Sequence, residues 1–423
     1  MFLKLYKFAA IAATSAALSY SAQAQTGRYI QPIFPNITVT TNIQYGSAVG
    51  YGATQASPLL LDIYEPTGDT ATLRPLVIAV YGGSFIGGSK EAADIQRWCD
   101  TLANLGYIAI AHNYRVGFNP FQTGSVVRAG YRALQDTRAA VRFAKEYSAT
   151  YKIDTNQIFM VGNSAGAISA LQAAYISDSD RPAQTFGIQG AAGQDTTDQL
   201  GIDQSTNSFA HTTTVKAIVA LWGAVLDTNM INTNDNTSVL MIHGDADSTV
   251  PIDIAPAFFN PAFPTLYGSR AIASRINSMG MTAELEVYAG QGHNFYSTSA
   301  TTFNAYWDTI ANHGINFLCR FNTYCNTALI NVIAVDKSAQ SLQSFPMFPN
   351  PAHSELTVVF DKAYNQSELF VQLYNIQGQM VQAPLTLREN SATFQVENLA
   401  NGLYLVQIKT PNGFSAQKFV VQH

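Results

Sequence analysis

A serine between two glycines is the first residue whose setting points to chemistry. Gly162-Asn-Ser164-Ala-Gly166 has the pattern G-x-S-x-G and lies between an apolar run, Ile158 to Val161, and an apolar helical pattern, Ala165 to Ile176. In a strand, tight turn and helix, this pattern exposes a serine hydroxyl at the end of a sheet. Glycines permit the sharp turn, and the helix dipole favours negative charge that develops there. The sequence therefore predicts Ser164 as a nucleophile, with an ordinary strand-to-helix turn as the alternative.

An acid and a histidine that could serve this serine follow two later apolar runs. His243-Gly-Asp245-Ala-Asp247 comes after Val239 to Ile242, and Gly290-Gln-Gly292-His293 comes after Ala283 to Tyr288. An acid on a loop just past a strand can orient a histidine, and His293 lies on such a glycine-rich loop. The two acids are not a calcium loop, because the glycine at its sixth position and the terminal glutamate are missing. The residues alone leave both Asp245 and Asp247 open as the acid.

The other histidines have plainer interpretations. His112 and His243 lie within or at the end of apolar runs, where a hydrogen-bonded core histidine is expected. The sequence names no partner for His211 or His313.

A glycine pair offers a place for developing negative charge. Tyr81-Gly-Gly-Ser-Phe85 follows the apolar run Leu76 to Tyr81. Consecutive glycines let backbone N–H groups approach a carbonyl oxygen with no side chain in the way. A simple glycine turn is the alternative. A phosphate loop is excluded, because Gly87-Gly88-Ser89-Lys90 does not fit the G-x-x-x-x-G-K-[ST] register.

These motifs need a scaffold that carries loops at strand ends. From about Leu59 to Phe317 apolar, β-branched runs alternate with helical patterns, which predicts βα units around a mostly parallel sheet. The polar segment from Ser177 to Thr214 lacks an apolar period and is predicted to be a long insertion, either a lid or a solvated excursion. The predicted strands are Leu59 to Tyr64, Leu76 to Tyr81, Ile108 to Tyr114, Ile158 to Val161, Val215 to Leu221, Val239 to His243 and Ala283 to Tyr288. The predicted helices are Ala92 to Leu105, Val126 to Tyr147, Ala165 to Ile176, Ser269 to Met279 and Thr302 to Leu318.

Serine, acid and histidine follow one another in the order that the α/β-hydrolase arrangement requires. Residues from about 59 to 318 resemble the α/β-hydrolase carboxylesterases, especially those with H-G-G-G and G-x-S-A-G motifs, and Gln135-Asp136-Thr-Arg138-Ala-Ala-Val141 is similar to their pattern as well. The chain departs from H-G-G-G at two positions, with Tyr81 for the histidine and Ser84 for the third glycine.

The resemblance assigns roles to six residues. It implies Ser164 as the nucleophile, Asp247 in the D-x-x-V-P stretch as the acid, and His293 as the base. Backbone N–H groups of Gly83, Ser84 and Ala165 are the implied oxyanion donors. The implied activity is hydrolysis of a carboxylic ester through an acyl-enzyme, with neither metal nor organic cofactor. A serine peptidase on the same fold and a non-catalytic adhesive hydrolase-like protein are the alternatives.

The last 75 or so residues have a different pattern. Apolar residues alternate with period two in Leu356 to Phe360 and Leu403 to Ile408, which predicts a small all-β sandwich. Phe348-Pro-Asn-Pro351, Leu399-Ala-Asn-Gly402-Leu-Tyr404 and Lys418-Phe-Val-Val421 resemble the C-terminal sorting domain of the Bacteroidota type IX (Por) secretion system. The resemblance implies that secretion machinery is a partner. A carbohydrate-binding sandwich is the alternative, although no solvent-facing row of Trp or Tyr is evident.

The first residues predict export. Lys4 and Lys7 precede an Ala-rich apolar stretch that ends with the small-x-small site Ala22-Gln23-Ala24. A membrane anchor is disfavoured because the apolar run breaks at Ser19. The predicted organisation is a signal peptide (1–24), an α/β-hydrolase domain (25–330), a linker (331–347) and a β-sandwich sorting domain (348–423). The protein is expected outside the cell or on its surface after passing through the periplasm.

Composition excludes some functions and bounds the cysteine chemistry. Charged residues make up 12% of the chain, the net charge is −5, and no basic block could neutralise a run of phosphates, so nucleic-acid binding is disfavoured. No later segment predicts a membrane span. Cys319 and Cys325 are close enough to close a small loop in an oxidising compartment, which leaves Cys99 as the odd thiol. Zinc spacing is absent around them.

Overall fold

The computed structural model divides the chain into two compact units, Met1–Asn326 and Thr327–His423. It describes residues 27–187, 199–232, 236–325, 345–360, 363–364, 370–375, 380–381, 383–410 and 413–423. The predicted signal peptide and residues 331–344 of the predicted linker lie outside the described residues. Within the described residues, no helix has the length and apolar character that crossing a membrane requires.

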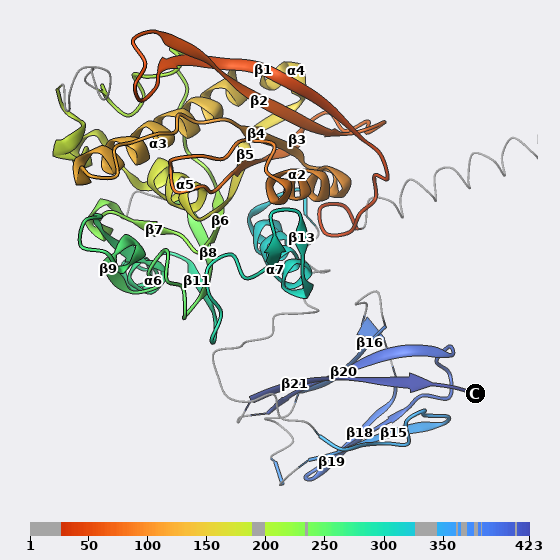
Figure 1. Cartoon of the computed structure of the whole chain (residues 1–423). Helices are drawn as coiled ribbons and strands as arrows, with labels where there is room; N and C mark the ends of the chain where they lie inside the picture. Colours follow the sequence, from red (N-terminus) through yellow and green to blue (C-terminus); the bar gives the residue numbers. More distant parts are fainter. Residues whose placement is uncertain are drawn as a thin grey trace, which may run out of the picture. The chain divides into compact units, whose positions relative to one another are not determined.

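An eight-stranded sheet organises the first unit, in the order β1-β2-β4-β3-β5-β6-β8-β11 (Figure 1). The first two pairings, β1 with β2 and β2 with β4, are antiparallel, and all the others are parallel. The strands are β1 (Ile37–Val49), β2 (Ala56–Pro66), β3 (Arg74–Val80), β4 (Ile108–His112), β5 (Ile153–Asn163), β6 (Ala217–Leu221), β8 (Ser238–Gly244) and β11 (Ala283–Tyr288). Strands β3, β4 and β6 are buried at every position, as expected for parallel strands covered on both faces.

Helices cover this sheet. Helix α2 packs against α7 through Trp98 and Trp307, whose ring centroids lie 5.5 Å apart, while α3 lies beside α5 (Figure 1). The helices are α2 (Ala93–Leu105), α3 (Thr123–Glu146), α4 (Ser148–Tyr151), α5 (Ala165–Tyr175), α6 (Ser269–Ser278) and α7 (Ala305–Phe321). Short strands complete the unit: β7 (Ala224–Val225), β9 (Ile254–Pro256) and β10 (Thr265–Gly268) in one sheet, and β12 (Ser297–Ser299) and β13 (Thr302–Phe303) in another.

All the predicted strands and helices of this unit are present, with bounds that differ by up to five residues, and the structure adds short elements that the sequence did not predict. The helix predicted from Thr302 begins at Ala305, because Thr302 and Phe303 form β13 and the Asn304 side chain caps the helix by accepting a hydrogen bond from the Tyr306 N–H. Strand β1 was not predicted. Most of its positions are exposed, so it lacks the apolar run that identifies the central strands.

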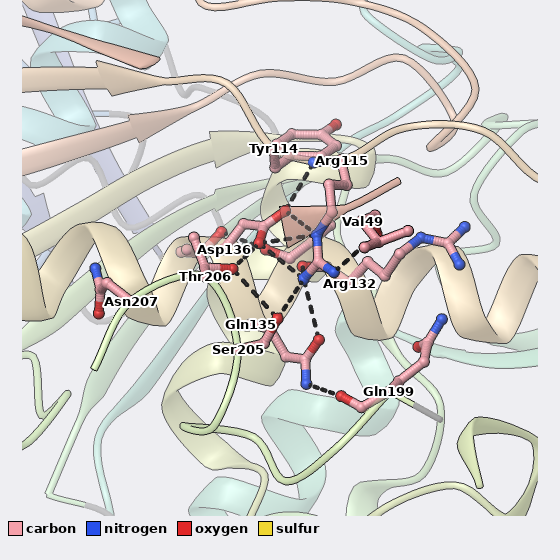
Figure 2. Close-up of polar contacts among 12 residues, drawn as sticks. Val49, Tyr114, Arg115, Arg132, Gln135, Asp136, Gln199, Ser205, Thr206 and Asn207 are labelled. Carbon is pink, nitrogen blue, oxygen red and sulfur yellow. Dashed lines mark hydrogen bonds and ion pairs between the residues drawn. The ribbon is translucent and has the colours of Figure 1, made fainter. Parts of the chain in front are cut away.

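Part of the predicted insertion is bound to helix α3. Asp136 on α3 is fully buried and accepts hydrogen bonds from the Arg115 backbone N–H at 2.8 Å and from Arg115 Nε at 2.9 Å, as Figure 2 shows. Arg115 Nη2 also donates to Ser205 Oγ at 3.1 Å, and Gln135 Nε2 donates to the Gln199 carbonyl at 2.5 Å. The segment from Gln199 to Asn207 is therefore held against α3 by buried polar contacts.

Two antiparallel four-stranded sheets form the second unit and enclose one apolar core. Their orders are β14-β15-β19-β18 and β17-β16-β20-β21. The strands are β14 (Met347–Phe348), β15 (Glu355–Val359), β16 (Phe370–Asn375), β17 (Met380–Val381), β18 (Leu385–Arg388), β19 (Ser391–Gln395), β20 (Gly402–Thr410) and β21 (Gly413–Val421). The two units confirm the predicted fold class, an α/β-hydrolase sheet followed by a small all-β domain.

The cysteines pair as predicted. A disulfide joins Cys319, in the last turn of α7, to Cys325, with Cα atoms 5.4 Å apart. Cys99 is a free thiol on α2 and is fully buried. Burial raises the pKa of the Cys99 thiol well above its usual range, which keeps it protonated and unreactive.

Candidate active site

Ser164 occupies a strained turn between β5 and α5. Its backbone has φ 52° and ψ −125°, a conformation that a residue with a side chain adopts only at a cost. The two flanking glycines allow the close approach of the chain that this turn requires. A Cβ on Gly166 would lie 2.0 Å from the Val80 carbonyl oxygen, and one on Gly162 would lie 2.7 Å from the Gly166 oxygen. The turn therefore fits the G-x-S-x-G pattern sterically and brings Ser164 beyond the end of β5.

Loops after β8 and β11 bring an acid and an imidazole to this serine. His293 Nε2 lies 2.9 Å from Ser164 Oγ, and His293 Nδ1 lies 2.7 Å from Asp247 Oδ2. A proton on Nδ1 donates to the carboxylate, which leaves Nε2 as the acceptor for the Ser164 hydroxyl. One continuous hydrogen-bonded chain thus joins three residues predicted from the sequence.

Asp247 is buried and strongly hydrogen-bonded. Burial alone would raise its pKa, but hydrogen bonds from His243, His293 and the Thr249 backbone N–H outweigh this effect, so the pKa of Asp247 lies well below its usual range. Its Oδ1 accepts from the N–H groups of Thr249 at 2.7 Å and Val250 at 3.0 Å. The carboxylate therefore stays ionised beside the imidazole.

His243 is a core histidine, as the sequence predicted. It is fully buried, its Nδ1 lies 2.8 Å from Ser269 Oγ, and its Nε2 lies 3.0 Å from the Val250 carbonyl oxygen. The same Nε2 lies 3.3 Å from Asp247 Oδ2. Asp247 is thus placed between two imidazoles, one in the core and one facing Ser164. No local sequence pattern indicates the contact with His243.

Asp245 has a different place in the structure. Its Oδ1 accepts a hydrogen bond from the Gly290 N–H at 2.6 Å, and its own N–H donates to the Tyr288 carbonyl at 3.2 Å. These bonds join the loops after β8 and β11. Of the two acids that the residues left open, Asp247 is the one hydrogen-bonded to His293.

The residues predicted to supply the oxyanion donors share cavity walls with Ser164. Gly83 and Ser84 both have positive φ, 131° and 54°, and a Cβ on Gly83 would lie 2.2 Å from the Gly87 carbonyl oxygen. Ser84 and Ala165 line the same cavity as Ser164. Within the described chain, no backbone carbonyl accepts from the N–H of Gly83, Ser84 or Ala165.

Tyr81 supports this loop where the esterase motif has a histidine. Its ring stacks on that of Tyr114, with centroids 4.1 Å apart and planes 10° apart. The Tyr114 hydroxyl donates to the Tyr81 carbonyl at 2.9 Å, and the Tyr81 hydroxyl donates to the Tyr114 carbonyl at 3.2 Å. This reciprocal pair fixes the residue from which the glycine loop begins.

Ser164 opens onto two cavities of different character. One is narrow, about 60 Å³, and mainly apolar, with Phe85, Phe118, Ile168 and Leu266 in its wall. The other is a wider cleft of about 650 Å³ whose wall includes Asp94, Trp222, His293 and Ser297. Described residues of the segment from Ser177 to Thr214 line neither of them. Nothing in that part of the segment therefore covers Ser164.

Three further histidines of the first unit contact groups other than Ser164. His112 is fully buried on β4, as predicted, with Nε2 3.2 Å from Thr137 Oγ1. His211 and His313, for which the sequence named no partner, lie 2.8 Å from Glu146 Oε2 and 2.6 Å from Glu286 Oε2. Among the residues that the structure describes, no three His, Cys, Asp or Glu side chains form a group that could hold a metal ion.

Sequence reasoning missed three residues beside the reacting groups. Asp94, Trp222 and Tyr296 line the wide cleft, and the Trp222 ring lies 6.0 Å from that of His293. Asp94 lies on α2, Trp222 just after β6 and Tyr296 on the loop after β11, and none of them has a motif around it. Their proximity arises from packing between elements, which local patterns do not report.

Comparison with known families agrees with this architecture. The BD-FAE family model matches residues 61–237, and the model described as "Secretion system C-terminal sorting domain" matches residues 346–422. The chain combines an α/β-hydrolase domain with a C-terminal secretion-system sorting domain. The hydrolase match includes Ser164, and the sorting domain indicates export to the cell surface or the medium.

Curated relatives align with part of the chain. Carboxylesterase 3B of Mus musculus is 34% identical over 113 residues, which is 26% of this chain and 19% of that protein. Neuroligin-like protein glit-1 of Caenorhabditis elegans is 32% identical over 114 residues, 26% of this chain and 15% of that protein. The chain thus spans less than a fifth of the length of these relatives. A structure of Thermogutta terrifontis esterase 2 phosphorylated by paraoxon is 18% identical, with 69% of this chain and 96% of that chain covered and a TM-score of 0.47.

Proposed function

We propose that this protein is an exported serine hydrolase of carboxylic esters, with Ser164 as nucleophile, His293 as base and Asp247 as the orienting acid. The observation that carries the proposal is the hydrogen-bonded chain Ser164–His293–Asp247 at the mouth of an apolar cavity. Carboxylesterase and lipase relatives that align with part of the chain support the reaction class.

Acylation follows from these positions. His293 Nε2 takes the proton of the Ser164 hydroxyl while Oγ attacks the ester carbonyl carbon, and ionised Asp247 stabilises the resulting imidazolium. The oxyanion accepts hydrogen bonds from the N–H groups of Gly83, Ser84 and Ala165, and each such donor contributes about 3 kcal/mol in well-studied enzymes. The intermediate then collapses, the C–O bond to the alcohol breaks, and His293 returns its proton to the leaving alkoxide.

Deacylation repeats these steps with water. His293 takes a proton from a water molecule, which attacks the acyl carbon, and the proton then passes to Ser164 Oγ as the carboxylic acid leaves. No redox or metal chemistry enters this cycle. The narrow apolar cavity suits the acyl chain, and the wider cleft beside His293 suits the alcohol, because the proton must reach the leaving oxygen from that side.

The sorting domain sets the proposed route out of the cell. The signal peptide delivers the chain to the periplasm, and type IX secretion machinery recognises the C-terminal domain and passes the protein across the outer membrane. The match over residues 346–422 supports this route.

A substrate panel tests the proposed activity. Wild-type protein and Ser164→Ala are assayed with p-nitrophenyl esters of graded chain length, feruloyl esters, acetylated sugars and a p-nitroanilide. We expect wild-type ester turnover and a loss in Ser164→Ala that approaches the roughly 10⁶-fold of other serine hydrolases. Cleavage of the anilide at a rate comparable to the esters would indicate a peptidase. An inactive, well-folded wild type would indicate a non-catalytic adhesive protein.

A further inference from the structure

Asp94 joins the loops that carry the nucleophile and the base. It lies in the first turn of α2, far from Ser164 in sequence, and its Oδ2 accepts a hydrogen bond from Asn163 Nδ2 at 2.7 Å and from the Tyr296 hydroxyl at 2.7 Å. Asn163 immediately precedes Ser164, and Tyr296 follows His293 by three residues. One carboxylate oxygen therefore contacts the end of β5, next to Ser164, and the loop that carries His293.

We infer that Asp94 is a positioning residue that fixes the separation of Ser164 and His293. This inference rests on the proposed function, because it gives Asp94 a part in the same reaction. The structure places Asp94 outside the Ser164–His293–Asp247 chain, so its effect passes through the two loops.

The hydrogen bonds around Asp94 have matched donors and acceptors. Asn163 Nδ2 also lies 3.3 Å from the Tyr296 hydroxyl oxygen, so the amide donates to both groups and the hydroxyl donates to the carboxylate. Burial, and then the nearby charge of Asp94, raises the pKa of Tyr296 well above its usual range. Tyr296 therefore keeps the proton that it donates, and the three side chains form a closed ring of hydrogen bonds.

Aromatic packing holds Tyr296 in place within this set of hydrogen bonds. Tyr296 is almost fully buried, and its ring centroid lies 4.8 Å from that of Trp222 and 5.0 Å from that of Trp307. Trp222 in turn lies against His293. At the other side, the first turn of α2 favours a negative charge because the helix N-terminus is electropositive. Asp94 is thus fixed in place by the elements that position it.

The size of the expected effect follows from the geometry of proton transfer. Reaction at Ser164 requires the 2.9 Å contact with His293 Nε2, and a displacement of about 1 Å costs as much as 10²-fold in rate. Because His293 acts in both half-reactions, a loss of positioning slows acylation and deacylation together. A side chain that only contacted the leaving alcohol would affect acylation alone, since the alcohol has left before deacylation.

The test separates these two roles. In full-length protein, Asp94→Ala is compared with Asp94→Asn and with Asp100→Ala, which removes an exposed carboxylate from the same helix. Acylation is measured from the p-nitrophenol burst with p-nitrophenyl acetate, and deacylation from the decay of the acyl-enzyme by mass spectrometry. We expect Asp94→Ala to slow both steps by at least tenfold, and Asp94→Asn, which keeps an oxygen for both donors, to slow them less than threefold. Asp100→Ala should match wild type.

Other outcomes overturn the inference. If Asp94→Ala slows acylation alone, Asp94 is a contact of the alcohol, and if both rates match wild type, it has no part in the reaction. Should Asp94→Ala fail to fold, Tyr296→Phe is the alternative variant. It removes one of the two hydrogen bonds to Asp94 and keeps the aromatic side chain, and it must slow both steps severalfold. Failure of the proposed function looks different: wild-type protein would lack ester turnover, or Ser164→Ala would retain it.

Discussion

Asp247 contacts two imidazoles, whereas Asp245, the other acid of its loop, contacts neither. Its Oδ2 lies 2.7 Å from His293 Nδ1 and 3.3 Å from His243 Nε2, whereas Asp245 binds the backbone of the loop after β11. The depressed pKa of Asp247 keeps the carboxylate ionised throughout the pH range in which His293 must act as a base.

Exchange of each acid for its amide separates these roles. Asp247→Asn should lower kcat/KM by about 10⁴-fold, as in other serine triads, because an amide favours the wrong imidazole tautomer. Asp245→Asn retains an oxygen for the Gly290 N–H and should change kcat/KM less than fivefold, a loose bound consistent with an exposed turn contact. Steady-state kinetics on one soluble ester decides between them. The opposite ranking would assign the acid role to Asp245.

Residues of the site differ in how far the sequence predicts them. Ser164 is predictable because the pattern and its strand and helix are contiguous, and His293 because a glycine loop follows a strand. Asp247 required a resemblance to known esterases, since spacing alone does not distinguish it from Asp245. Asp94 and Tyr296 could not be predicted, because their hydrogen bond joins residues 202 positions apart that meet only when α2 packs beside the loop after β11.

At the scale of elements, β3 lies so close to the turn after β5 that it limits the size of the residue at position 166. Gly166→Ala places a Cβ 2.0 Å from the Val80 carbonyl, so β3 and α5 must move apart. We expect a loss of at least ~3 kcal/mol in the free energy of unfolding, from overpacking and strain, together with loss of ester turnover. Gly50→Ala is the control, because no atom lies within 4 Å of its added Cβ. Denaturant titration of the two variants measures the difference, and equal stabilities would refute this steric account.

His112, the last residue of β4, predicts a pH dependence of stability. Burial lowers the pKa of His112 to about 4, whereas an unfolded histidine titrates near 6.5. The unfolded state therefore binds a proton at higher pH than the folded state. Stability from this residue is complete above about pH 6.5 and is lost as the pH falls toward 4, by up to about 3 kcal/mol.

Tryptophan fluorescence can follow this effect in the full chain, because all three tryptophans lie in the first unit. Urea titrations at pH 7 and pH 4.5 give the loss for wild type and for His112→Gln, which cannot titrate in this range. The loss should be smaller by about 2 kcal/mol in the variant, which is most of the linkage expected at that pH. An equal loss in both proteins would show that other groups dominate.

The central elements were more predictable than the edges. Strands β3, β4 and β6 are buried on both faces and have continuous apolar sequences, so they are evident without tertiary information. Strand β1 lies at the edge of the sheet with most of its positions exposed, and its pairing with β2 is what defines it. Packing partners decide the structure of such edge segments.

At the scale of the whole molecule, the residues proposed as catalytic and the sorting domain lie in different units. Ser164, Asp247 and His293 all lie in the first unit, and the second has its own apolar core. Residues 25–334 alone should therefore fold and hydrolyse small esters within about twofold of the full-length rate, a change no larger than that of a remote surface substitution. In the source organism, loss of the second unit should leave active enzyme in the periplasm.

Cell fractionation and ester assays on the truncated protein measure both outcomes. Activity lost only on an insoluble polymer would make the second unit a binding module. Arrival of the truncated protein in the medium or at the surface would contradict the sorting role.

Covalent labelling tests the role of Ser164 most directly. Wild-type protein is treated with a p-nitrophenyl alkylphosphonate, digested, and mapped by mass spectrometry while residual ester turnover is followed. We expect one label per chain, on Ser164, with activity lost in proportion to labelling, and no label on Ser164→Ala or on His293→Ala at the same exposure. A label on another residue, or full turnover in protein labelled at Ser164, would contradict the proposed mechanism.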